Sequence, residues 1–185
     1  MSQWRENSMI KELDTVELIF VKALEEQSQL DSDRIINGHS VRGAELAKYV
    51  EEKIEATYNL DDVVIIFDME LEQDDDICIT EEIDDRYVRQ GVAVNFNLVI
   101  YGNASDLMAK TLKSRFQSNY VSNYFSEYEV NVYNVSSGQT TTEIVNNTVW
   151  QRTDMSIKLD FEMNIQKVSD FKTFQKLNSI TTESF

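Results

Sequence analysis

Few residues in this chain could do catalytic chemistry. The chain has one histidine, His39, and one cysteine, Cys78. A serine or cysteine nucleophile needs a nearby base, and His39 lies in a polar stretch with no motif around it, so we predict a surface histidine. The single cysteine excludes an intrachain disulfide and a cysteine-based zinc site. None of the five glycines belongs to a phosphate-binding loop. We therefore predict no enzyme.

An acidic run at Asp74, Asp75 and Asp76 is the strongest candidate for a metal site, since calcium prefers several oxygen ligands. The EF-hand pattern counted from Asp74 requires glycine at its sixth position and glutamate at its twelfth. The chain has Ile79 and Asp85 there. Runs of like charge are usually solvated, so we predict an exposed acidic hairpin at 68–85 and no metal.

Tryptophan and arginine stand at the start of a long alternating segment. Both residue types are enriched at protein interfaces, so Trp150 and Arg152 are candidate contacts to another subunit. The alternative, that Trp150 only folds over the edge of a sheet, is equally supported. The candidate interface comprises the polar-side residues Trp150, Arg152, Asp154, Lys158, Asp160 and Glu162.

The segment from Met155 to Ile165 alternates apolar and polar residues without interruption. Strand side chains point alternately to opposite faces, so this pattern predicts a strand with one buried face, over 149–166. Eleven such residues span about 35 Å at roughly 3.3 Å per residue, enough to extend past the body of a small domain. The aromatic cluster at 120–133 lacks interleaved cations and is predicted to pack in a core or interface.

Other segments predict the elements around this strand. Apolar spacing indicates helices at 8–27, 43–58 and about 104–116, the last capped by Asn103 or Ser105. Period-two patterns indicate strands at 62–72, 87–101 and 129–135, with a returning hairpin strand beginning at 77–80 and a loop around Gly138. Residues 171–185 fit a short helix or a partner-dependent tail.

This order predicts an α+β fold with an antiparallel or mixed β-sheet and helices packed on one face. The length fits a single domain over 1–185. It would comprise N-terminal helices at about 8–58, a strand and helix body at about 62–168 and a C-terminal tail at 169–185.

The formal charge of −16, from 17 basic and 33 acidic residues, predicts poor binding to DNA and to anionic membranes. No segment is apolar and long enough to span a membrane, and residues 1–30 lack the continuous apolar stretch of a signal peptide.

Three segments together resemble a known family. They are GVAVNFNLVIYGNASDLMAKTLKSRF at 91–116, YEVNVYNV at 128–135 and NNTVWQRTDMSIKLDFEM at 146–163. A strand ending in Tyr101-Gly102 leads into a helix, and a later strand begins with Trp150-Gln151-Arg152. This arrangement, over about 63–168, resembles the neck or tail-terminator proteins of long-tailed bacteriophages.

The resemblance implies a structural virion protein, made in the host cytoplasm, that forms a hexameric ring at the head-proximal end of the tail. Such a ring ends polymerisation of the tail tube protein and meets the head-tail connector or a head-completion protein. It implies no catalysis and no cofactor, and DNA would pass without specific binding. The acidic hairpin with Asp74, Asp75 and Asp76 would line the channel or lie exposed.

Two alternatives remain. The first is another neck, head-completion or baseplate structural protein, and the second is an unrelated soluble binding module or acidic enzyme.

Overall fold

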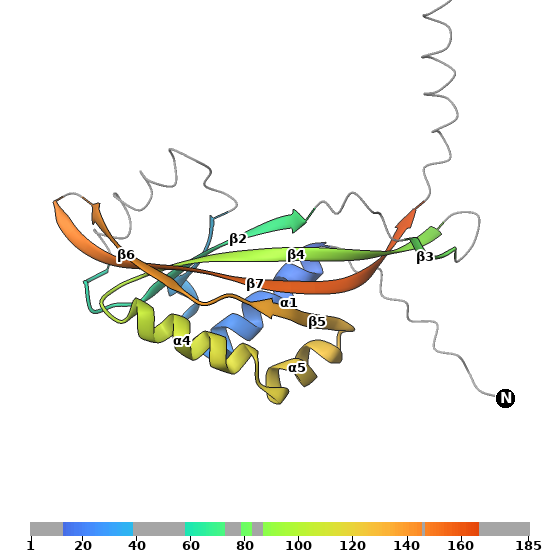
Figure 1. Ribbon diagram of the computed structural model, residues 1–185, viewed down its shortest axis with the longest axis horizontal. Helices are drawn as coiled ribbons and strands as arrows, with labels where there is room; N and C mark the ends of the chain where they lie inside the picture. The colour runs from blue at the N-terminus through green and yellow to red at the C-terminus, as the bar shows by residue number, and fades with distance from the viewer. Residues whose placement is uncertain (1–12, 39–57, 73–78, 83–86, 146, 167–185) are drawn as a thin grey trace, which may run out of the picture.

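One long, twisted β-sheet runs through the molecule, with helices against one of its faces (Figure 1). Figure 1 shows a computed structural model, which describes residues 13–38, 58–72, 79–82, 87–145 and 147–166. The strands are β1 Ile35–Asn37, β2 Val64–Glu72, β3 Ile79–Glu82, β4 Tyr87–Tyr101, β5 Val130–Val135, β6 Gln139–Val145 and β7 Thr148–Gln166. The helices are α1 Leu13–Ser28, the 3-10 helix η1 Ser32–Arg34, α4 Ser105–Phe116 and α5 Asn119–Ser126.

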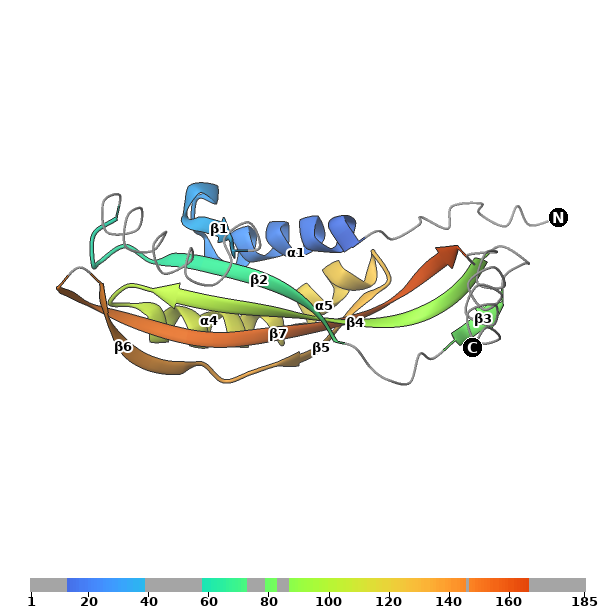
Figure 2. The same cartoon turned by 90° about the horizontal axis from the view of Figure 1, so that it is seen from above.

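Strands β4 and β7 form the centre of the sheet. They pair antiparallel along their whole shared length, from Tyr87 opposite Gln166 to Tyr101 opposite Arg152. The far side of β4 pairs with β2 and β3, which lie end to end, and the far side of β7 pairs with β5 and β6 in the same way. The expected long strand is therefore confirmed, and it extends beyond the helical cover at both ends (Figure 2).

The main core lies between the sheet and the helices. Odd-numbered residues of β7, such as Ile157, Leu159 and Phe161, are buried against apolar residues of α1, α4 and α5. Near the centre, Phe20 of α1 stacks on Phe96 of β4 with 3.7 Å between ring centroids. Since β1 pairs parallel with β2 and the other pairings are antiparallel, the predicted α+β fold with a mixed sheet and one-sided helices is confirmed.

A second, smaller apolar cluster lies on the other face of the sheet. It contains Val64 and Ile66 of β2, Tyr101 of β4 and Trp150 of β7, with Tyr58 packed against it. The period-two pattern predicted for 62–72 does not reveal this cluster. Residues 63–67 are all buried, because this uninterrupted apolar run supplies side chains to both faces.

Strand pairing differs from the predicted hairpin at 68–85. The segment β3 pairs with β4 and not with β2, so the returning strand belongs to the next hairpin along the chain. The region predicted as a loop around Gly138 contains β6, and the aromatic segment contains α5; the short strand β1 has no predicted counterpart. Each of these elements is short or polar, so its sequence shows no clear apolar period.

The predicted helix at 104–116 is confirmed, but its predicted caps are wrong. Ala104 occupies the cap position without a side-chain hydrogen bond. Asn103 instead donates to Asp61 at 3.0 Å, and the buried Ser105 accepts a hydrogen bond from Thr153 at 3.0 Å. Both side chains therefore make tertiary hydrogen bonds and do not cap the helix. Residues 8–12 and 43–57 of the other predicted helices, and the tail at 167–185, lie outside the described residues.

Gly102 makes the turn from β4 into α4. Its φ is +120°, a region that side chains disfavour, and its N–H donates to the carbonyl of Gln151 at 3.0 Å. A Cβ at this position would overlap the backbone oxygen of Asp62. The Tyr-Gly pair that ends β4 therefore has a structural reason for its glycine.

We expect Gly102→Ala to destabilise the fold by about 1–3 kcal/mol, because it combines backbone strain with a steric overlap. Denaturant unfolding of the purified protein measures this. Gly91→Ala is the matched control, since a Cβ at Gly91 would meet no atom within 4 Å and alanine suits a strand better than glycine. Equal stability of the two variants would contradict the role of Gly102.

Candidate functional site

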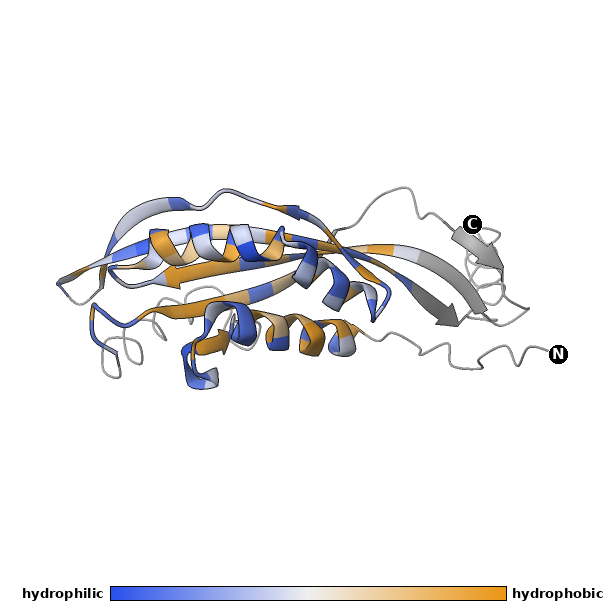
Figure 3. Ribbon diagram, turned by 90° about the horizontal axis from the view of Figure 1, so that it is seen from below, coloured by the Kyte–Doolittle hydropathy of each residue, from blue (hydrophilic) through white to orange (hydrophobic). Residues whose placement is uncertain are grey.

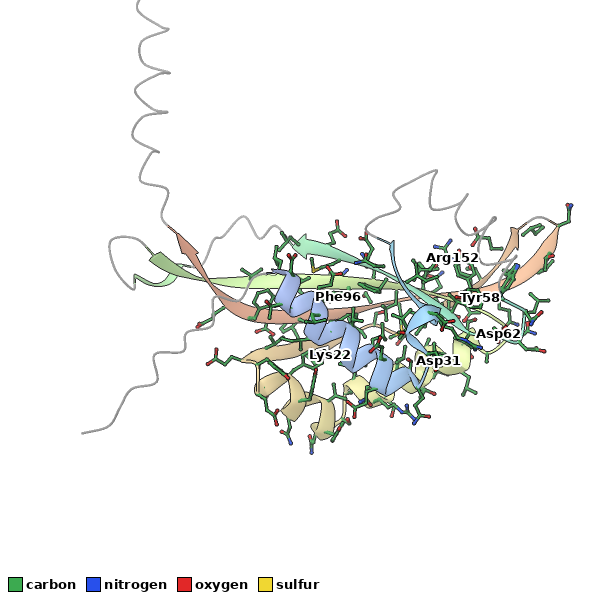
Figure 4. All side chains as sticks on the ribbon, turned by 180° about the vertical axis from the view of Figure 1, so that it is seen from behind. Lys22, Asp31, Tyr58, Asp62, Phe96 and Arg152 are labelled. Atoms are coloured by element: carbon green, nitrogen blue, oxygen red, sulfur yellow. The ribbon has the colours of Figure 1, made fainter. Side chains whose placement is uncertain are left out.

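The six candidate interface residues share one face of β7. Buried odd-numbered residues from Thr153 to Phe161 face the helices, so the even-numbered residues from Trp150 to Glu162 face the opposite side. Arg152 lies across the sheet from α1 (Figure 4). The common face predicted for these residues is thus observed, although their surroundings differ along the strand.

Trp150 is buried in this single chain, with 2% of its surface exposed. It packs in the second apolar cluster with Val64, Ile66 and Tyr101. Its indole N–H is the one buried side-chain polar atom among the described residues that lacks a hydrogen-bond partner. The side chain therefore contributes to the packing of the subunit itself, and its role as an interface residue stays a prediction.

Arg152 organises a polar network beside Trp150. Its Nε donates to Asp154 at 2.8 Å, and its Nη1 contacts the Glu143 carboxylate on β6 at 3.2 Å. Tyr101 donates its hydroxyl to the same Glu143 oxygen at 2.8 Å, and the guanidinium lies 6.0 Å from the centre of the Tyr101 ring. Side chains of β4, β6 and β7 therefore meet in one hydrogen-bonded network, which links β6 to the centre of the sheet.

Electrostatics favour this network with the tyrosine neutral and the arginine charged. Burial raises the pKa of Tyr101, and its hydrogen bond to Glu143 raises it further. Burial acts to lower the pKa of Arg152, but hydrogen bonds to Asp154 and Glu143 outweigh it, so the pKa is raised. A neutral hydroxyl and a paired guanidinium position strands here and do not supply a catalytic base.

Further along β7 the same face is polar and more open. Lys158 lies 5.2 Å from the centre of the Tyr133 ring on β5, and Asp160 accepts a hydrogen bond from Asn131 at 3.4 Å. Glu162 is exposed and pairs in register with Gly91. Lys158 and Asp160 are half-buried and Glu162 is exposed, so these three residues lie apart from the buried Trp150 cluster.

The remaining candidates are not brought into this site. Asp74, Asp75 and Asp76, with His39 and Cys78, lie outside the described residues. Within the parts of the chain that the structure describes, no three histidine, cysteine or acidic side chains are grouped so that they could hold a metal ion.

Sequence reasoning missed the tip of the β6–β7 hairpin. Ile144 and Val149 are paired across the hairpin and are 72% and 57% exposed. The turn that joins the strands includes Asn147, whose φ of +67° is one that asparagine tolerates. Two apolar segments separated by Asn-Asn are a hairpin signal that could have been found.

Comparison with known proteins agrees with this geometry. A model of a family described as phage neck terminator protein matches residues 53–183, which span β2 to β7 and make up more than half of the chain. A search of curated proteins found no match. Among the described helices, none is long and apolar enough to cross a membrane.

This family match defines a structural protein of the bacteriophage neck. The chain belongs to the phage neck terminator protein family. This confirms the resemblance seen in the sequence, and it makes the chain a virion component that contacts other head or tail proteins.

We expect Trp150→Ala to lower the free energy of unfolding by about 3–5 kcal/mol, because it empties a buried site. Arg152→Ala should cost less than about 1 kcal/mol, since its ion pairs are partly solvated. Denaturant unfolding of both variants checks this difference. A similar loss in both would mean that Trp150 is not a main packing residue of its cluster.

The network also predicts a dependence on alkaline pH. The pKa of Tyr101 is raised above its ordinary value of 10, so folding favours the neutral hydroxyl. Its contribution to stability is complete below about pH 10 and is lost as the pH rises further. We expect Tyr101→Phe to reduce this loss in unfolding experiments above pH 10. An unchanged slope in Tyr101→Phe would exclude this effect.

Proposed function

We propose that the protein is a tail terminator: it forms a closed ring at the head-proximal end of the tail, stops polymerisation of the tail tube and offers a joining surface to the head-tail connector or head-completion protein. The observation that carries this proposal is the family match across the whole central sheet. The number of subunits we propose is six, from the resemblance to phage tail terminators.

The shape of the subunit supports assembly into a ring. The sheet is longer than its helical cover, with the β6–β7 hairpin at one end and the β3–β4–β7 ribbon at the other (Figure 2). Strands that extend past the body of a subunit can reach a neighbour. A contact between two different surfaces closes into a ring when its rotation completes a circle.

The polar part of the sheet fits the wall of a DNA passage. Asp68 and Glu70 of β2 share a face with Asp160 and Glu162 of β7, and Lys158 is the basic residue among them. DNA phosphates are repelled by such a surface, so a genome would pass with little adhesion. We assign this face to the lumen of the ring, together with the predicted acidic hairpin at Asp74, Asp75 and Asp76.

Size-exclusion chromatography with light scattering, followed by electron microscopy of the main peak, tests this function. We expect a hexameric ring whose inner wall is acidic, and we expect the protein in purified virions. A stable monomer at high concentration that is also absent from virions would overturn the proposal. A ring with a neutral or basic inner wall would overturn the assignment of the lumen alone.

A further inference from the structure

The two lateral edges of the sheet differ strongly in charge. Strands β1 and β2 lie at one edge with α1, and β5 and β6 lie at the other, where α4 packs (Figures 2 and 3). The described residues of the first side, 13–38 and 58–72, contain eleven acidic and two basic residues. The second side, 103–151, contains four acidic and three basic residues. Most of the negative charge on these two sides therefore lies along one edge.

The edge formed by β5 and β6 is open and nearly free of charge. Among the described strands, both pair with β7 only, so their outer backbone groups have no strand beside them. Residues 130–145 contain one charged side chain, Glu143, and it is held by Arg152 and Tyr101. Proteins usually protect such an edge with several charges or with proline, and this edge has a single, paired charge and no proline. Its exposed Tyr133 and Ile144 add apolar surface.

Two lysines of α4 lie near this open edge, whereas Arg115 of the same helix donates to the carbonyl of Gln27 on α1. Lys113 donates to Ser137 of the β5–β6 connection at 2.6 Å, and Lys110 is exposed one turn earlier. Ala109 of the same helix approaches Gly138 so closely that a Cβ there would meet it at 2.9 Å. Helix α4 and the β5–β6 edge thus form one continuous side of the subunit, which we call the neutral side.

The opposite side, which we call the acidic side, also has free strand length. Strand β2 pairs with β1 only through Ile65–Phe67, so 68–72 has no described strand on that side. The segment carries Asp68, Glu70 and Glu72, and its first two acids are exposed. Charged side chains of this kind prevent two acidic sides from pairing with each other.

We propose that the neutral side of one copy binds the acidic side of a second copy, and that this head-to-tail contact is the subunit junction of the ring. The inference rests on the proposed function. In the proposed ring the neighbour of each subunit is a second copy, and two acidic sides repel each other because each carries a large excess of acids. Of these two described sides, the neutral side, with Lys110 and Lys113 of α4, is the one that an acidic neighbour can approach with little repulsion.

A charge-swap experiment tests this junction. The neutral-side variant Asn134→Glu/Thr142→Glu adds two acids at exposed positions of β5 and β6. The acidic-side variant Glu70→Lys/Glu72→Lys reverses two charges on β2. We expect the neutral-side variant to raise the apparent dissociation constant of the ring at least tenfold, because acids then face acids. Combining all four substitutions in one chain should restore the ring, because the new acids then meet lysines.

The control Ser122→Glu/Asn123→Glu adds the same charge on exposed positions of α5 and should leave the ring intact. Circular dichroism must show wild-type folding for each variant, and Thr141→Glu replaces the first variant if that variant unfolds. A neutral-side variant that assembles as well as wild type would overturn the proposed junction, as would a combined variant that stays dissociated. Failure of the wild-type chain to form a ring at all would instead overturn the proposed function.

Discussion

The antiparallel ladder between β4 and β7 determines the rest of the structure. Its register, with Tyr101 opposite Arg152 at one end and Tyr87 opposite Gln166 at the other, sets which side chains face the helices. A shift by one residue would turn every core residue of β7 to the outer face. All the other antiparallel strands pair with one of these two, so their positions also depend on this register.

The motifs Tyr101-Gly102 and Trp150-Gln151-Arg152 have a physical explanation in this ladder. Tyr101 and Arg152 are cross-strand partners at its end, and both contact Glu143 on β6. Gly102 allows the chain to turn close to the backbone of Asp62. Trp150 packs on the outer face against Val64 and Ile66 of β2 and Tyr101 of β4. The motifs therefore hold β6 against the two central strands, β4 and β7, and do not mark a reactive centre.

Most of the central architecture could be predicted from the sequence. Strands β2, β4, β5 and β7 and helix α4 each show a clear apolar period, and the helices on one face follow from the alternation of β7. What could not be predicted depends on tertiary contacts. Strand β6 is mostly polar, so its sequence shows no apolar alternation, and β1 has only three residues. Sequence alternation also placed Trp150 on the correct face but did not reveal the apolar cluster that buries it, which requires Val64 and Ile66 from a distant strand.

The register of the ladder also has a consequence for how the chain folds. The β6–β7 hairpin closes locally, with Val145 opposite Thr148, whereas Tyr87 must find Gln166 across most of the second half of the sequence. Local hairpins form in microseconds, and distant pairings must first overcome the entropy of closing a long loop. We expect the hairpin and the helices α4 and α5 to form early, and the pairing of β4 with β7 to limit the folding rate. Newly made chains expose the unpaired edge of β7 until that step is complete. A higher concentration of such chains during synthesis therefore favours aggregation over folding.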